Sequence, residues 1–155
     1  MTYNIRPMRE SDIDEVHAIE TSVHIAPWGK NTLRDCVLVG YNCLVLEIEV
    51  NNTWNLAGYM ICRHSDRNCH ILNLCIAKSL QSQGYGRKFL QHVLGVLTQI
   101  EDIDYAVLEV RPSNAVALHL YESMGFKQAE IKQGYYDDND KLEDAIFLKK
   151  KLHTP

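Results

Sequence analysis

The stretch QSQGYGRKFL, residues 81–90, places two glycines directly before a strongly amphipathic run. Glycine costs a helix interior about 1 kcal/mol relative to alanine, so Gly84 and Gly86 need a separate reason to stand there. The residues before the stretch are typical of a β-strand, and residues 84–100 predict a helix. The apolar stripe of that helix is formed by Phe89, Leu90, Val93, Leu94 and Leu97.

A glycine-rich turn at the start of a helix can bind phosphate. The first-turn N–H groups of a helix lack partners within the helix and carry the positive end of its dipole. Glycine lets a phosphate approach these groups without a Cβ in the way, and Arg87 and Lys88 would add positive charge. The stretch has no Walker A pattern, and Phe89 stands where a dinucleotide fingerprint needs its third glycine. From these residues alone, a purely structural turn is an open alternative.

The composition indicates one globular domain over residues 1–155. Of the 155 residues, 46% are hydrophobic and 23% are charged, which suits a real core and a hydrated surface. No run approaches the roughly 18 consecutive apolar residues of a membrane span, and residues 1–12 show no signal segment, so we expect a cytoplasmic protein without a membrane partner. The net charge of −4 argues against direct nucleic-acid binding and suits a basic partner. We expect a monomer or a weak dimer.

The cysteines predict reduced, mostly buried thiols rather than disulfides. Their number is odd and they form no Cys-x-x-Cys pair; they are Cys36, Cys43, Cys62, Cys69 and Cys75. A metal site could be imagined on residues 62–70, which hold two of these cysteines together with His64 and His70. These residues straddle a predicted hairpin without a standard ligand spacing, so we expect no metal.

Hydrophobic periodicity and turn residues predict an α/β (α+β) fold, with a mixed, mostly antiparallel sheet flanked by helices. The predicted strands cover residues 3–8, 43–50, 55–65, 69–77, 105–110, 126–132 and 144–152, the last two around a loop at 133–143. A first helix begins with Ser11 as its N-cap and is broken by Pro27-Trp28-Gly29. Further helices cover residues 31–39 and 114–124, the latter ended by Gly125 in a left-handed conformation.

Two motifs resemble the GNAT family of N-acetyltransferases. Residues 81–86 are similar to the family's Gln/Arg-x-x-Gly-x-Gly/Ala loop, and LYESMGF, residues 120–126, resembles its late Leu-Tyr-x-x-x-Gly-Phe segment. The resemblance covers essentially the whole chain and implies the GNAT fold, with acetyl-CoA as co-substrate and its pyrophosphate on the loop. By this resemblance the coenzyme-binding residues are Leu74, Cys75, Ile76, Gln81, Ser82, Gln83, Gly84, Tyr85, Gly86, Arg87 and Asn114.

One position departs from the family pattern. Ser82 stands where an arginine is common in the most similar members, so one charge facing the phosphates is lost. If Arg87 and the backbone amides dominate binding, the affinity for acetyl-CoA survives; if they do not, it is weaker than usual. Asn114 could simply cap its helix, but Ser113 could serve as the cap instead, which would leave the Asn114 amide to the coenzyme.

The resemblance also implies an acid and a base. Glu109 ends a predicted strand on the same side as Tyr105 and Val107, where ligands of α/β sheets gather, although a surface glutamate would also fit there. By resemblance it removes a proton from the substrate amine through water. Tyr121 would protonate the departing coenzyme thiolate, and its ring could pack in the core at the same time. No cysteine nucleophile is required.

A narrower resemblance concerns the acceptor. Residues 108–126, Pro27-Trp28 and residues 134–148 together look like the bacterial members that acetylate the N-terminal alanine of the eighteenth small-subunit ribosomal protein. This implies a protein N-terminus as substrate, with Trp28, Tyr135 and Tyr136 as walls of a peptide pocket. These aromatics could equally close a core, and the acidic residues at 137, 138 and 140 could be a solvated loop or favour a basic peptide. Other possibilities are a small-molecule amine or a lysine as acceptor, or a non-catalytic acyl-CoA-binding regulator.

Overall fold

The computed structural model describes residues 2–24, 26–138 and 141–153, without the side chains of residues 135–138 and 141–143. The helices are α1 (Ile13–Val23), α2 (Lys30–Leu38), α3 (Tyr85–Leu97) and α4 (Ala115–Ser123). The strands are β1 (Tyr3–Pro7), β2 (Asn42–Val50), β3 (Thr53–Ser65), β4 (Asn68–Ile76), β5 (Tyr105–Val110), β6 (Lys127–Asp138) and β7 (Lys141–Lys151). Two 3₁₀ turns lie at Glu10–Asp12 and Lys78–Leu80.

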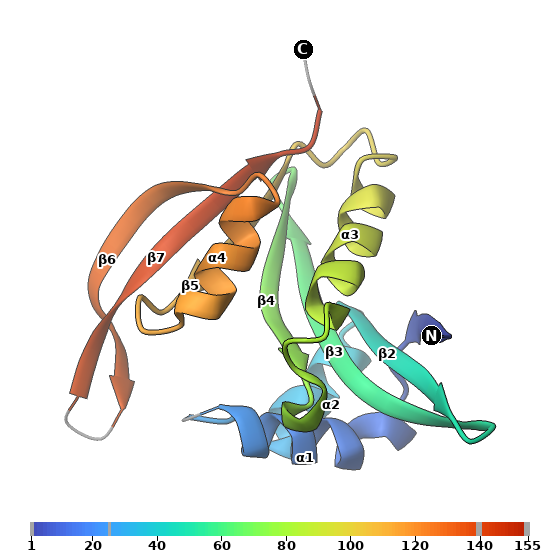
Figure 1. The fold of residues 1–155 in the computed structure, drawn as a ribbon. Coiled ribbons are helices and arrows are strands. Elements are labelled where there is room, and N and C mark those ends of the chain that lie inside the picture. Colours follow the sequence, from blue (N-terminus) through green and yellow to red (C-terminus); the bar gives the residue numbers. More distant parts are fainter. Residues whose placement is uncertain (1, 25, 139–140, 154–155) are drawn as a thin grey trace. The chain divides into compact units, whose positions relative to one another are not determined.

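The described strands form one mixed sheet in the order β1-β2-β3-β4-β5-β7-β6, which confirms the predicted fold class. Figure 1 shows β2, β3 and β4 next to one another and β6 beside β7. The pairs β1–β2, β2–β3, β5–β7 and β6–β7 are antiparallel, whereas β4 and β5 are parallel. No described helix is long and apolar enough to cross a membrane.

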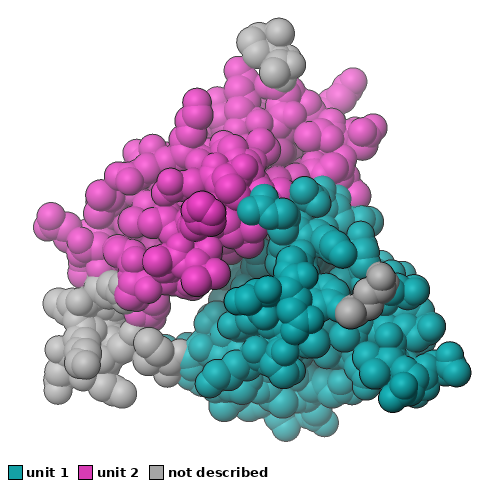
Figure 2. All heavy atoms as spheres, viewed as in Figure 1, with its two compact units in different colours: residues 1–63, 72–92 teal, residues 64–71, 93–155 magenta. Residues whose placement is uncertain are grey.

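The chain divides into two compact units, which Figure 2 colours separately. Unit 1 comprises residues 1–63 and 72–92, and unit 2 comprises residues 64–71 and 93–155. Neither unit is a continuous stretch of chain, because β4 and α3 each contribute to both. The single-domain organisation of residues 1–155 stays a prediction.

In unit 1, α1 and α2 lie side by side and bury one face each in a common core (Figure 1). This core unites Met8, Ile13, Val16, Leu33, Cys36, Cys43, Val45, Tyr59, Ile61 and Cys75. The break at Pro27-Trp28-Gly29 is confirmed, because α1 ends at Val23 and α2 begins at Lys30. The predicted stripe of α3, a helix that contributes to both units, is also confirmed, since each of its five apolar residues is at most 6% exposed.

Tight turns connect β2 to β3 and β3 to β4. Asn51 and Asn52 have positive φ angles of 51° and 63°, and Asp66 and Arg67 have φ angles of 51° and 65°. Two consecutive left-handed residues are the signature of a type I′ hairpin turn, whose twist matches that of the strands. Asparagine and aspartate tolerate this conformation better than most residues, so the predicted turns after residues 50 and 65 are confirmed.

The predicted N-cap Ser11 is wrong. A 3₁₀ turn comes first, and Asp12 at its end accepts a hydrogen bond from the Arg9 N–H at 2.8 Å. The same carboxylate accepts two bonds from the Arg6 guanidinium, at 2.8 and 2.9 Å. These bonds hold the pKa of Asp12 below its usual value, with the Arg6 hydrogen bonds as the largest cause. A bidentate partner on β1 therefore determines where this helical segment begins.

Glu20 of α1 is 1% exposed and connects four segments of unit 1. Its Oε1 accepts hydrogen bonds from the Tyr59 hydroxyl on β3 and from Asn73 Nδ2 on β4, the latter at 2.8 Å. Its Oε2 accepts from the Trp28 N–H at 2.9 Å. Burial above all raises the pKa of Tyr59 far above its ordinary value, with contributions from Cys75 and Glu20, so the phenol keeps the proton that it donates.

In unit 2, β6 and β7 extend further than the sequence predicts. The expected loop at 133–143 is wrong, because β6 continues to Asp138 and β7 begins at Lys141. Gly134 has a positive φ of 61° inside a register shift between Lys132 and Tyr136, and pairing resumes beyond it. The Gly134 N–H donates to Asp144 Oδ1 at 3.0 Å, which anchors this irregularity to β7. Cross-strand bonding therefore outweighs the turn propensity of the glycine and the acidic residues.

Replacing Glu20 with alanine should strongly destabilise unit 1. The change leaves the buried Tyr59 hydroxyl and the partly buried donors of Asn73 and Trp28 without their common acceptor, so we expect a loss of about 3–5 kcal/mol in the free energy of unfolding. Urea denaturation followed by circular dichroism measures this loss. The control is Glu15→Ala, on the exposed side of the same helix, which should change the free energy by about 0.5 kcal/mol or less. Equal losses in both variants would show that the buried bonds contribute nothing.

Candidate functional site

The glycine turn lies in unit 1, where the 3₁₀ turn Lys78–Leu80 and residues 81–84 connect β4 to α3. Ser82 and Gly84 have positive φ angles of 64° and 87°, and the Lys88 N–H donates to the Gly84 carbonyl at 3.1 Å. Helical bonding therefore starts at Gly84, and Tyr85, Gly86 and Arg87 form the first turn. A Cβ built on Gly84 meets no atom within 4 Å, so its backbone conformation and not crowding requires the glycine there. The open backbone over a helix N-terminus fits an anionic ligand.

Gln81 holds the turn against the end of β4. Its Nε2 donates to the Ile76 carbonyl at 3.0 Å, and Gln83 Nε2 donates to the Ser79 carbonyl at 3.3 Å. Both glutamine side chains thus stabilise the conformation of the turn itself. The predicted coenzyme residues of the strand and of the turn are therefore brought together within unit 1.

Leu74, Cys75 and Ile76 lie beyond the ladder between β4 and β5. That ladder pairs Asn68–Ile71 with Tyr105–Leu108. Cys75 is buried, and burial is the main cause that raises the pKa of its thiol to about 12. The thiol is therefore protonated at neutral pH and is a poor nucleophile.

Glu109 in unit 2 contacts His70. The distance from Glu109 Oε2 to His70 Nε2 is 2.8 Å, and both side chains are largely but not fully buried. The geometry follows from the register: His70 is opposite Val107 in the parallel ladder, and Glu109 is the next β5 residue on that side. An ionised carboxylate only accepts, so the imidazole N–H donates in this bond. The predicted position of Glu109, on the side of Tyr105 and Val107, is confirmed.

Tyr121 is held by a Schellman motif at the end of α4. The Phe126 N–H donates to the Tyr121 carbonyl and the Gly125 N–H to the Glu122 carbonyl, each at 3.1 Å. Gly125 has a φ of 96°, as the motif requires and the sequence predicts. The apolar contact of the motif is made by the rings of Tyr121 and Phe126, whose centroids are 5.7 Å apart. Tyr121 is 8% exposed, so its packing role is confirmed.

Asn114, and not Ser113, is the N-cap of α4. Asn114 Oδ1 accepts a hydrogen bond from the Ala117 N–H at 3.2 Å, so the expectation that Ser113 takes over this role is wrong. Asparagine is among the best N-cap residues because its short side chain reaches the third N–H of the helix. A contact of Asn114 with the coenzyme stays a prediction.

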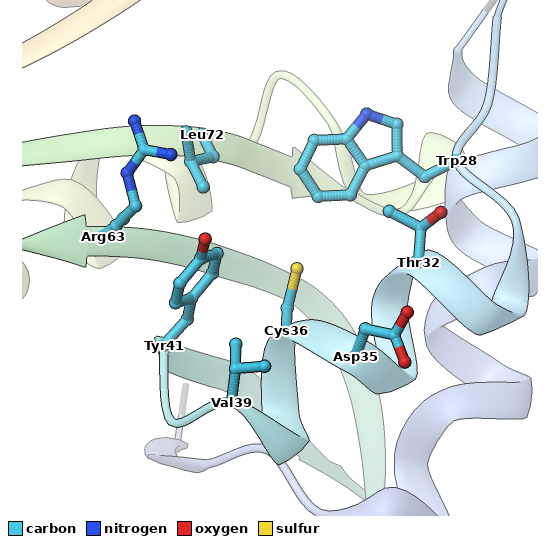
Figure 3. Close-up of a pocket in the computed structure, with 8 residues that line it drawn as sticks. All are labelled: Trp28, Thr32, Asp35, Cys36, Val39, Tyr41, Arg63 and Leu72. Carbon is cyan, nitrogen blue, oxygen red and sulfur yellow. The ribbon is translucent and has the colours of Figure 1, made fainter.

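Trp28 lines a cavity of about 350 Å³ in unit 1 (Figure 3). The other lining residues come from α2 and its C-terminal turn, from Arg63 of β3 and from Leu72 of β4. The remaining predicted peptide-binding residues, Tyr135 and Tyr136, belong to β6, and their side chains lie outside the described part of the chain. The same holds for the side chains of the acidic run, and residue 140 is not described at all.

Two residues with structural roles around the site, Glu20 and His70, are not identified by the sequence patterns. Glu20 continues the helical spacing of the buried Ile13 and Val16, so a charged residue in an apolar stripe was the available signal. His70 was considered only as a metal ligand, although it is on the strand next to Glu109. Among the side chains that the structure describes, no three His, Cys, Asp or Glu are grouped so that they could hold a metal.

Comparison with known proteins shows close similarity to acetyltransferases. Residues 11–126 match the model of the Acetyltransferase (GNAT) family. A [ribosomal protein bS18]-alanine N-acetyltransferase from Haemophilus ducreyi is 32% identical over 145 residues, which cover 93% of this chain and 97% of that protein.

Solved structures show the same fold. The ribosomal-protein-S18-alanine N-acetyltransferase from Escherichia coli superimposes with a TM-score of 0.87 and 28% identity, covering 99% of this chain and 96% of that one. NAA60 from Arabidopsis thaliana, solved in complex with acetyl-CoA, gives a TM-score of 0.84 at 17% identity, with 97% and 98% of the two chains covered. The sheet order and the glycine turn are consistent with the family that the sequence match shows. The chain belongs to the acetyltransferase (GNAT) family.

Proposed function

We propose that this protein transfers the acetyl group of acetyl-CoA to the N-terminal alanine of the eighteenth small-subunit ribosomal protein. The observation that carries the proposal is the turn at the start of α3, where the backbone over Gly84 is open. The H. ducreyi relative, whose name specifies this reaction, supports the choice of acceptor. A ribosomal acceptor implies a cytoplasmic reaction, and the net charge of −4 suits a basic partner.

The residues of unit 1 fit the coenzyme. The first-turn N–H groups at residues 85–87 and the exposed side chain of Arg87 would bind the pyrophosphate, which carries the negative charge that a helix N-terminus favours. Leu74, Cys75 and Ile76 would offer backbone groups to the pantetheine arm, since they lie beyond the β4–β5 ladder. Acetyl-CoA would supply the acetyl thioester that the amine attacks.

Glu109 would act as the general base. The amine must lose a proton as its nitrogen bonds to the acetyl carbon, and a carboxylate within reach, directly or through one water, can take this proton. The hydrogen bond from His70 holds one carboxylate oxygen at 2.8 Å and thereby orients the other. His70 is thus a positioning residue for the base.

Tyr121 would act as the general acid. The bond between the acetyl carbon and sulfur breaks as the new amide forms, and the departing thiolate needs a proton. A phenol, with an ordinary pKa of about 10, carries one at neutral pH. The contact with Phe126 restricts the ring and the Schellman motif fixes the backbone that carries it, which lowers the entropy lost on reaching the reactive geometry.

Replacing Gly86 with valine should weaken acetyl-CoA binding at least tenfold. The new branched side chain would stand in the first turn of α3, where we place the pyrophosphate. Isothermal titration of the folded variant measures the affinity. The control is Gly95→Val in the same helix, where a Cβ has no neighbour within 4 Å, and its affinity should be unchanged. Unaltered binding by the Gly86 variant would exclude the turn from the coenzyme site.

Replacing Glu109 with glutamine should lower kcat/KM by about 10²–10⁴-fold at pH 7. A free α-amine has a pKa of about 8, so at pH 9.5 most of it is already deprotonated and the loss should be smaller. A pH series of initial rates tests this dependence. The control is Glu130→Gln, an exposed glutamate on β6, which should leave the profile unchanged. A loss that is equal at every pH would contradict a base role.

The preferred acceptor should be a peptide that begins with alanine and continues with basic and aromatic residues. Its α-amine is partly neutral at cellular pH, whereas a lysine amine with a pKa of about 10.4 is mostly charged, so the α-amine needs less help from the base. Mass spectrometry of peptide mixtures identifies the acetylated amine. Tyr136→Ala should raise the KM for the peptide and leave the affinity for acetyl-CoA unchanged. Faster acetylation of lysine or of polyamines would overturn the acceptor and leave the family assignment intact.

A further inference from the structure

The cavity lined by Trp28 has features that the proposed chemistry does not use. Its volume of about 350 Å³ is at the lower end of the range for ligand sites, which runs from roughly 300 to 1,000 Å³. A site of this size suits one large side chain and is too small for a coenzyme. Figure 3 shows the Cys36 sulfur, the Tyr41 ring and the Trp28 indole around one space, with Arg63 and Leu72 at its side.

The lining favours an uncharged, flat group. Trp28 and Tyr41 are aromatic, Leu72 is aliphatic, and burial together with Asp35 raises the pKa of the Cys36 thiol, which keeps it neutral. Arg63 repels a cation, and its guanidinium is attracted to the face of an aromatic ring. Ring–ring contacts add stability beyond the burial of their area.

An anion is disfavoured for a complementary reason. Asp35 also lines the cavity and offsets the attraction of Arg63 for an anion, because a carboxylate would be placed near a like charge as well. The rim is formed in part by Val39, an apolar residue that is 67% exposed at the end of α2. An exposed apolar rim suits a protein substrate better than a small, strongly hydrated amine.

The position of Leu72 relates the cavity to the coenzyme strand. Leu72 packs against the core cluster that also contains Cys75 of the same strand, so the cavity wall adjoins the part of β4 where we place the pantetheine arm. The turn where we place the pyrophosphate follows the C-terminal end of β4. A pantetheine arm held by the backbone of residues 74–76 would therefore bring the acetyl group toward the end of this segment that is nearer to Leu72.

We propose that this cavity is the subsite for an aromatic side chain of the acceptor protein, close to the amine that is acetylated. The inference rests on the proposed function, because it takes the acceptor to be a polypeptide. The bond from the Trp28 N–H to the buried Glu20 holds the segment of chain that carries the indole, so the subsite is preformed. A preformed subsite loses little conformational entropy on binding.

A panel of peptides tests the subsite. Each peptide begins with alanine and carries a single phenylalanine at position 2, 3, 4 or 5 of an otherwise phenylalanine-free sequence. Titration into the enzyme saturated with CoA measures binding without turnover. We expect one position to bind at least tenfold more tightly than the phenylalanine-free peptide. Equal affinities for all peptides, or no measurable binding of any, would overturn the proposal.

A matched pair of variants locates the gain in affinity. Val39→Trp places an indole at the cavity rim and should reduce the gain to less than twofold, with acetyl-CoA affinity unchanged. Leu38→Trp, at a neighbouring residue that is 63% exposed and does not line the cavity, should retain the gain. Both positions are exposed, so loss of folding is not expected in either variant. A gain that persists in Val39→Trp would overturn the proposal.

The same peptides separate the subsite from the proposed function. Acetylation of the α-amine without any gain from phenylalanine would overturn the subsite alone. A gain that depends on Val39, combined with no α-amine acetylation of any alanine-led peptide, would overturn the proposed acceptor and support the subsite.

Discussion

The arrangement of unit 1 depends on one buried carboxylate, that of Glu20. Its two oxygens accept bonds from β3, β4 and the segment between α1 and α2, which no apolar contact could align in the same way. A buried carboxylate is costly unless its oxygens accept hydrogen bonds, and this one accepts from a hydroxyl, an amide and a backbone N–H, with His24 Nε2 3.4 Å from Oε1. The cost of burial is thus offset by bonds that specify where the helices sit against the sheet.

Local patterns were sufficient to predict most of the fold. The buried stripe of α3, the break at Pro27 and the left-handed Gly125 all follow from interactions within a few residues of one another. Glu20 could not be placed in this way, because its partners Tyr59 and Asn73 are 39 and 53 positions away in the sequence. A prediction from sequence needs a register before it can pair such residues.

The candidate site shows the same division. The turn at residues 81–86 was predictable because its glycines and the following helix are contiguous, and the position of Glu109 followed from strand alternation. The partner of Glu109 was not predictable from the sequence, because His70 comes within reach of Glu109 only through the parallel register of β4 and β5. The full length of β6 and β7 was not predictable for a related reason. Their turn-forming residues predict a loop, whereas the hydrogen bonds between the two strands, which local sequence does not specify, extend the pairing.

The high pKa of the Cys75 thiol, about 12, has a consequence for redox chemistry. Each proposed turnover would release coenzyme A as a free thiol along the strand that carries Cys75. Disulfide exchange requires that the attacking sulfur is a thiolate. Oxidation to sulfenic acid also starts from the thiolate. A cysteine that is buried and protonated forms neither a mixed disulfide with the product nor a sulfenate at an appreciable rate. Cys75 would therefore stay unmodified under oxidative conditions that attack an exposed, ionised cysteine beside a substrate.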